Sequence, residues 1–124
     1  MACQDSCPLI FFNVPAGASL CLRVQRTAGT VQAAAVNAQW LQAGAVIGTQ
    51  TIALNPTVPA TLCRPLGTAD QLRFDVRLVL AKQSAAQVEA EVIRDDGTRH
   101  GRLQCAPFTS GNKGSTQQCI VDAL

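Results

Sequence analysis

Hydrophobic and polar residues alternate along most of the chain, a pattern typical of β-strands with one buried face. The clearest run spans residues 71–82, where every second residue from Leu72 to Leu80 is apolar. Residues 88–93 repeat the pattern, with Val88, Ala90 and Val92 between polar neighbours. We predict that these two segments form an antiparallel pair. Charged side chains would then face each other across the solvated side, Arg73 and Arg77 opposite Glu89 and Glu91.

Shorter alternating segments cover residues 10–14, 20–24, 52–54, 58–62 and 102–105. In the first of them the pattern points Ile10, Phe12 and Val14 inward. Turn signals separate the segments, namely Pro15-Ala16-Gly17, Asn55-Pro56 and Asp95-Asp96-Gly97. Seven or eight short, mostly antiparallel strands predict a single all-β domain over residues 1–124, either a β-sandwich or a small open barrel.

Two segments do not fit a simple strand. Residues 31–42 are rich in Ala and Gln, which favours a short helix with Val31, Ala34, Ala35, Ala38 and Leu41 on one stripe. The alternation of Val36, Ala38 and Trp40 fits a strand instead, and both alternatives stay open. Residues 109–118 are rich in Gly, Ser, Thr and Asn, which predicts a flexible polar loop held down by Cys119.

The composition indicates one globular domain. The chain has 124 residues, of which 48% are hydrophobic and 15% charged, with a net charge of +2. These values exclude a disordered chain. The ten basic residues are scattered, so nucleic-acid binding is not expected. The sequence lacks an apolar stretch long enough for a transmembrane helix.

Residues with catalytic or metal-binding chemistry are few. His100 is the single histidine and follows a turn, so we expect an idle surface imidazole. The cysteine spacings do not match a zinc site, and residues 111–116 have the wrong residue order for a phosphate loop. The acidic residues are explained by a turn and by an outward strand face. We therefore expect no enzyme activity, cofactor, metal or small-molecule substrate.

Six cysteines are many for a cytosolic protein this small, and none of them forms a C-x-x-C pair. The cysteines therefore indicate an oxidising compartment. They are Cys3, Cys7, Cys21, Cys63, Cys105 and Cys119. Cys21 and Cys63 are out of phase with the apolar residues beside them, which predicts disulfide partners at a sheet surface or edge. A Cys105–Cys119 bond would close a loop of about 15 residues and stabilise the fold by about 3 kcal/mol. All fifteen connectivities stay open.

The beginning of the sequence fits a lipoprotein. Ala2-Cys3 matches the end of a bacterial lipoprotein signal, in which the cysteine receives the lipid. We interpret the chain as a mature form, with the signal removed, a start Met supplied and residues 1–8 as a tether. Lipid on Cys3 would leave five cysteines and one of them free, for example Cys7. The alternative is a disulfide between Cys3 and a neighbour such as Cys7.

Four segments follow one another in a familiar order: residues 14–24 (VPAGASLCLRV), 46–52 (VIGTQTI), 58–62 (VPATL) and 72–78 (LRFDVRL). In these the chain resembles the YscW/YbaY family of small bacterial lipoproteins. The family has a Pro-x-Gly-Ala turn before its first strand, then a Gln-Thr-Ile strand, a short Val-Pro strand and a long alternating Arg-rich strand. The resemblance covers roughly residues 14–93. The cysteine-rich ends and the long segment 27–43 depart from the family pattern.

The members of this family that belong to type III secretion systems are pilotins. The resemblance therefore implies a protein anchored by a lipid on Cys3 at the periplasmic face of the outer membrane. Its implied partner is the secretin subunit, and Gln4 is compatible with sorting to the outer membrane. Phe11, Trp40 and Leu41 are our candidate apolar contacts for this partner; the alternative is that all three belong to the core.

Two other hypotheses stay open. The first is a periplasmic or secreted β-sandwich that binds a ligand or inhibits an enzyme, with six cysteines in three bridges and no lipid. The second is an envelope lipoprotein of the same family without a role in secretion.

Overall fold

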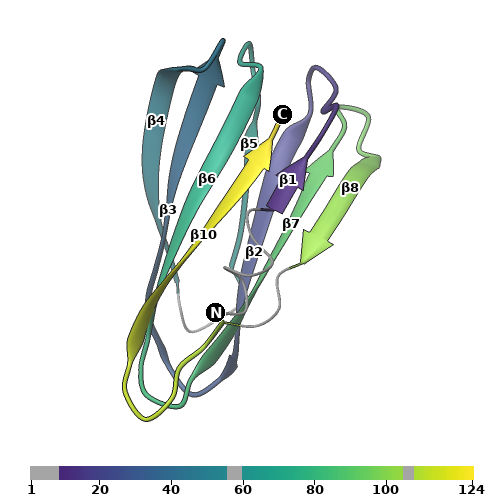
Figure 1. Ribbon diagram of the computed structural model, residues 1–124. Helices are drawn as coiled ribbons and strands as arrows, with labels where there is room; N and C mark the ends of the chain where they lie inside the picture. Colours follow the sequence, from purple (N-terminus) through teal and green to yellow (C-terminus); the bar gives the residue numbers. More distant parts are fainter. Residues whose placement is uncertain (1–8, 56–59, 105–107) are drawn as a thin grey trace.

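The computed structural model describes residues 9–55, 60–104 and 108–124, and over these residues the chain forms ten β-strands and no helix (Figure 1). The strands are β1 (Leu9–Phe11), β2 (Ser19–Ala28), β3 (Val31–Gln42), β4 (Ala45–Leu54), β5 (Ala60–Pro65), β6 (Gln71–Leu80), β7 (Ala85–Ile93), β8 (Arg99–Gln104), β9 (Phe108–Thr109) and β10 (Ser115–Ala123). The predicted all-β class is confirmed.

The strands form two sheets packed as a β-sandwich, without closing into a barrel (Figure 1). The first sheet has the order β1-β10-β6-β3-β4 and is antiparallel except for the β1–β10 pair. The second sheet has the order β5-β2-β7-β8, and β9 also pairs with β7. The outermost strands of the first sheet are therefore β1 and β4, and those of the second are β5 and β8.

The core lies between the sheets, where the strands β6, β7 and β2 contribute alternate side chains. The five inward residues of β6 are at most 1% exposed: Leu72, Phe74, Val76, Leu78 and Leu80. They face the buried residues of the second sheet, among them Leu20, Leu22, Val88 and Val92. Because the side chains of a strand alternate between its two faces, the period-two pattern of the sequence predicts which residues of these strands are buried.

The predicted pairing of residues 71–82 with 88–93 is wrong. β6 pairs with β3 and β10 in the first sheet, whereas β7 pairs with β2 and β8 in the second. As a hairpin, the two strands would place their apolar faces side by side and leave both to be covered by another layer. In opposite sheets the two faces cover each other, which removes more apolar surface from water.

The helix alternative for residues 31–42 is also wrong, because β3 is a strand between β4 and β6. Its pairing shifts register between Val31 and Ala33 on the β6 side, and between Trp40 and Leu41 on the β4 side. Such irregularities insert an extra residue into a strand. On the β6 side the extra residue lies in β3, so the inward residues Val31 and Ala34 are three apart, a spacing that resembles one face of a helix. On the β4 side the extra residue is Ile47 of β4, so Trp40 continues the inward alternation while the buried Leu41 lies on the other face.

Both ends of the described chain differ from the predicted pattern. Residues 115–118, expected in a flexible loop, belong to β10 and pair with Leu80 to Arg77 of β6. At the other end Leu9 and Phe11 point into the core, whereas Phe12 is 61% exposed. The phase predicted for Ile10 and Phe12 is therefore inverted. β1 runs parallel to β10, and this pairing directs Leu9 and Phe11 to the same face as Val121 and Ala123.

Two phenylalanine substitutions test the placement of the core. We expect Phe74→Ala to lower the free energy of unfolding by about 3 to 5 kcal/mol, because a fully buried ring is lost and a cavity remains. Phe12→Ala removes an exposed ring and should change stability by less than about 0.5 kcal/mol. Urea unfolding followed by far-UV circular dichroism measures both. Equal losses in the two variants would contradict the assignment of inner and outer faces.

Candidate functional site

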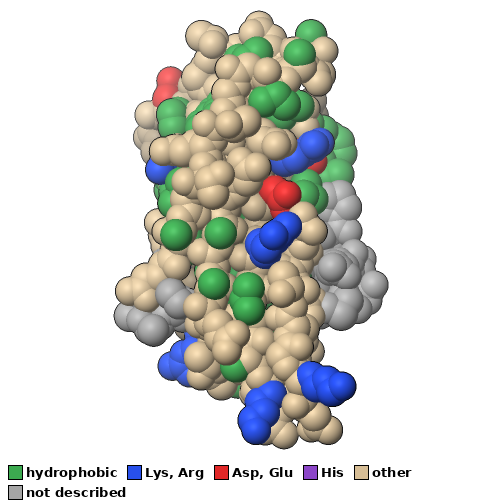
Figure 2. All heavy atoms as spheres, turned by 90° about the vertical axis from the view of Figure 1, so that its left-hand side faces the viewer, with side chains coloured by type: hydrophobic (Ala, Val, Ile, Leu, Met, Phe, Trp, Pro, Cys, Tyr) green, Lys and Arg blue, Asp and Glu red, His purple; other side chains and the backbone are tan. Residues whose placement is uncertain are grey.

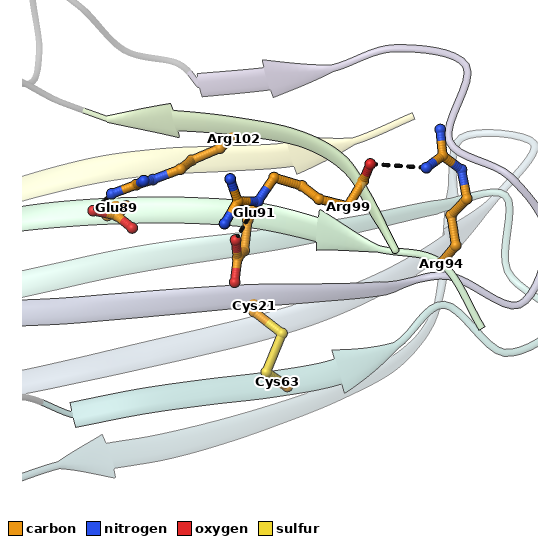
Figure 3. A network of polar contacts seen from close by, with 7 residues as sticks. All are labelled: Cys21, Cys63, Glu89, Glu91, Arg94, Arg99 and Arg102. Carbon is orange, nitrogen blue, oxygen red and sulfur yellow. Dashed lines mark hydrogen bonds and ion pairs between the residues drawn. A yellow bond between two sulfur atoms is a disulfide. The ribbon is translucent and has the colours of Figure 1, made fainter. Parts of the chain in front are cut away.

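The charged side chains on the outer face of the second sheet form ion pairs (Figure 3). Arg102 Nη2 lies 2.7 Å from Glu89 Oε2, and Arg99 Nε lies 2.9 Å from Glu91 Oε2. The glutamates thus pair with arginines of β8, not with Arg73 and Arg77 as predicted. The hydrogen bond and charge of Glu89 raise the pKa of Arg102 above its usual value. Ion pairs that are partly exposed contribute little to the stability of a fold. The two pairs connect β8 to β7.

The described cysteines take part in disulfides. Cys21 of β2 and Cys63 of β5 are bonded to each other (Figure 3). They are direct register partners on adjacent strands, with their Cα atoms 4.1 Å apart. This is the surface and edge position that their phase indicates, since β5 is an outermost strand. Cys119 is disulfide-bonded as well. Cys3, Cys7 and Cys105 lie outside the described residues, as do the predicted tether and lipid site.

His100 has a structural contact. Its Nε2 atom lies 3.0 Å from the carbonyl oxygen of Phe12, which links β8 to the segment after β1. Within the described ranges, His, Cys, Asp and Glu do not gather into a group of three or more that could hold a metal ion. No helix in this part of the chain is long and apolar enough to cross a membrane.

The three candidate partner contacts lie in different environments. Phe11 is 5% exposed, and its ring lies against Gly101 of β8. Leu41 is 7% exposed. Phe11 faces the core, whereas Leu41 pairs with Gln71 on the other face of the sheet. Both are buried, which makes them unavailable as direct contacts for a partner. Trp40 is half-buried, and its indole Nε1 donates a hydrogen bond to the carbonyl oxygen of Pro65 at 2.8 Å. Of the three, Trp40 is the residue that reaches the surface.

The strand β4 forms an open edge of the first sheet. It pairs with β3 on one side, and no other described strand pairs with it. All ten of its residues (AVIGTQTIAL) are uncharged, and it contains no proline. Val46 and Ile47 are 51% and 53% exposed. Figure 2 shows the side of the molecule on which β4 lies in Figure 1, and most of this surface is neutral, with scattered charged side chains.

A groove of about 350 Å³ lies at one end of β4. Its walls are Trp40, Ile47, Gly48 and the segment 65–69 that follows β5. Hydrogen bonds hold these walls together. The Ala43 amide donates to Asp70 Oδ2 at 3.1 Å, and the Asp70 amide donates to the Leu41 carbonyl oxygen at 3.1 Å. Together with the Trp40–Pro65 bond, they fix the groove before any partner arrives.

Sequence analysis did not single out Val46, Ile47 or Gly48 as candidate site residues. Its prediction of a strand at this point covered residues 52–54, the end of β4 that is half-buried against the core. The lack of charge and proline in β4 did not distinguish it, because the whole run of residues 27–55, including the inner strand β3, is uncharged and free of proline. Which strand lies at an edge, however, depends on the order of strands in the sheet, which such a run does not specify.

Comparison with known proteins supports the assignment of the fold and does not bear on function. No protein-family model matches the chain, and no curated protein is significantly similar to it. One solved structure is similar, a domain of unknown function (DUF4425) from Bacteroides vulgatus. The match covers 87% of this chain and 96% of that domain, with a TM-score of 0.58 and 11% sequence identity. At this identity the similarity supports the β-sandwich and does not extend to function.

Removal of the Cys21–Cys63 disulfide should destabilise the fold without changing its topology. The bond joins residues 42 positions apart, so the double variant Cys21→Ser/Cys63→Ser should lose about 4 kcal/mol in the chain-entropy model. Urea unfolding under non-reducing conditions measures the loss, and a thiol count on the unfolded variant verifies that the other cysteines are unchanged. A loss below about 1 kcal/mol would show that the strand ladder alone holds β5 in place.

Proposed function

We propose that the protein is a pilotin, a lipid-anchored periplasmic protein that binds the secretin subunit of a type III secretion system and escorts it to the outer membrane. The observation that carries the proposal is the surface formed by β4 and the Trp40 groove. It is uncharged, exposes Val46 and Ile47, and is held in place by hydrogen bonds. Such a surface suits the binding of another polypeptide, and an escort needs no catalytic group.

The arrangement of strands supports the proposal. The segments that carry the resemblance to the YscW/YbaY family lie in the turn before β2 and in β2, β4, β5 and β6, apart from residues outside the described ranges. β6 is the long alternating strand, and its outward Arg73 contacts Asp122 at 2.9 Å while its other face forms the core. The Cys21–Cys63 disulfide is consistent with the oxidising periplasm.

A lipid anchor gives the escort its driving force. A secretin subunit that awaits assembly exposes surface destined for the membrane, and a bound partner carries it to a bilayer by inserting acyl chains. Each buried CH₂ group contributes about 0.8 kcal/mol, so two or three chains are enough for stable attachment. In this proposal the acyl chains are attached to Cys3 and the folded domain supplies the secretin-binding surface.

The second candidate function is a disulfide-bonded binding or inhibitor protein without a lipid. One observation favours it: Cys21, Cys63 and Cys119, the cysteines within the described ranges, are all bonded. The two functions differ in their thiol count. Three bridges leave no cysteine for alkylation under denaturing, non-reducing conditions. A lipid on Cys3 leaves five other cysteines, so one of them is alkylated.

The escort function can be tested by expressing the precursor with its native signal, as wild type and as Cys3→Ser, together with the secretin. We expect the wild type to carry diacylglycerol on Cys3 by intact-mass analysis and to sediment with the outer membrane. The variant should become soluble, because it loses its acyl chains, and secretin multimers in the outer membrane should decrease.

The domain itself serves as the control, since Cys3→Ser leaves residues 9–124 unchanged and should retain secretin binding in solution. A wild-type protein that is unmodified and soluble contradicts the proposal and leaves the disulfide-bonded binding protein as the better hypothesis. A lipidated protein whose removal leaves secretin multimers intact assigns the chain to envelope lipoproteins without a role in secretion.

A further inference from the structure

The outer side of β4 presents a row of backbone groups to solvent. A strand at the end of an antiparallel sheet pairs every second residue with its neighbour, and the residues between direct their N–H and C=O groups outward. β4 is paired with β3 from Ala45 to Leu54, with Ile47 as an extra residue between the pairs of Val46 and Gly48, so the regular part of this row extends from Gly48 to Leu54. The ligand that satisfies such a row of alternating donors and acceptors is another extended polypeptide.

The other outermost strands carry features that hinder strand addition. β1 has three residues. β5 contains Arg64 and ends at Pro65, and β8 contains Arg99, His100 and Arg102. Short length, charge and proline are the usual protections of sheet edges. β4 has an irregularity at Ile47, near one end, but from Gly48 to Leu54 it has none of these protections, although an unprotected edge favours aggregation. A long unprotected edge is therefore explained by an occupant that covers it.

The neutrality of β4 selects the kind of segment that fits. Its outward residues Thr49, Thr51 and Ala53 offer no charge to pair with. A cation lies nearby: the Arg64 guanidinium donates to the neutral acceptors Gln50 Oε1 at 3.0 Å and Cys63 carbonyl oxygen at 2.8 Å, so it keeps its positive charge and repels a basic side chain. Because β4 itself offers no charge, most charged side chains of a segment laid along this edge would lose water without meeting an opposite charge on β4, which costs free energy. The edge therefore favours an uncharged strand.

The groove adds a side-chain requirement at one position. Gly48 is the register partner of Trp40 and lies on the inward face of β4. A Cβ atom at Gly48 would meet Trp40 Cε3 at 3.8 Å, an ordinary contact, and nothing closer. The space that a larger residue would fill at position 48 is thus open to the strand next to β4. Directly paired residues share a face, so the residue opposite Gly48 points toward the groove.

We propose that β4 takes up an extended, uncharged segment of the partner as an added strand, and that an apolar side chain opposite Gly48 fills the groove beside Trp40. The inference rests on the proposed function in naming the partner, which is the secretin subunit. The groove then acts as the position that sets the register of the added strand.

A second copy of this chain fits the edge less well. If two β4 strands paired, the inward residue opposite Gly48 would be Gly48, Gln50, Ile52 or Leu54 of the other copy. Gln50 is hydrogen-bonded to Arg64, while Ile52 and Leu54 pack against the core of their own sandwich. Gly48 has no side chain to offer. In the regular part of β4, from Gly48 to Leu54, the copy thus lacks a free apolar side chain for the groove, and its exposed Val46 and Ile47 lie at and beyond the irregularity. A different protein can supply such a side chain.

The test measures binding of the purified full-length secretin subunit to the folded protein and four variants by pull-down and titration. Thr49→Lys places a charge on the open edge, and Gln39→Lys is its control, because Gln39 is the register partner of Thr49 one strand further in. Gly48→Leu fills the groove, and Gly48→Ala is its control. We expect Thr49→Lys and Gly48→Leu to weaken binding at least tenfold and the two controls less than threefold. Melting temperatures verify that all four variants fold.

Amide hydrogen exchange gives the second readout. Secretin binding should protect the outward amides of β4, which a partner bound elsewhere would leave unprotected. If the wild type binds the secretin and none of the four variants weakens binding, the strand addition is overturned and the proposed function stands. If the wild type does not bind the secretin, both the strand addition and the proposed function are contradicted. A wild-type dimer that Thr49→Lys converts to a monomer, with secretin binding unchanged, assigns the edge to a second copy and also overturns the inference.

Discussion

The structure depends on covering the apolar face of β6. Its five inward side chains are at most 1% exposed, and each contributes about 1.5 to 3 kcal/mol when it is removed from water. A single sheet cannot bury such a face, so the second sheet must lie over it. The inward residues of β2 and β7 meet this need, and the position of β7 in the second sheet follows from it. The sandwich is the arrangement in which both apolar faces are buried at once.

A sandwich, unlike a closed barrel, has edges, and this chain treats its edges differently. The second sheet is reinforced at both sides, by the Cys21–Cys63 disulfide at β5 and by the arginine–glutamate pairs at β8. In the first sheet β1 is short and lies beside β8, where His100 contacts the Phe12 carbonyl oxygen. β4 lacks such reinforcement along its outer side. The stabilising contacts and the proposed partner-binding surface therefore lie at different edges, so a ligand at β4 would leave the stabilising contacts undisturbed.

The groove at the Ile47 end of β4 is held in place by hydrogen bonds and is also exposed to solvent. Trp40 of the first sheet is hydrogen-bonded to Pro65 of the second, and Asp70 accepts a hydrogen bond from the turn after β3. These contacts define the groove. Ile47 remains exposed beside it. A preformed groove reduces the entropy lost when a partner binds, because its walls are already fixed. This arrangement gives the proposed escort role a physical basis.

The sequence by itself determined the all-β class, because alternation at period two has one structural meaning in segments such as residues 71–80. It also indicated that Cys21 and Cys63 lie on an outer surface, since their phase differs from that of Leu20 and Leu62. Tertiary structure decided which strands are neighbours. Periodicity reports which face of a strand is buried and carries no information on its partner, so the separation of β6 from β7 and the edge position of β4 were not predicted. The extra residue near the start of β3 likewise placed Val31 and Ala34 three apart, as on a helix, and only the place of β3 between β4 and β6 shows it to be a strand.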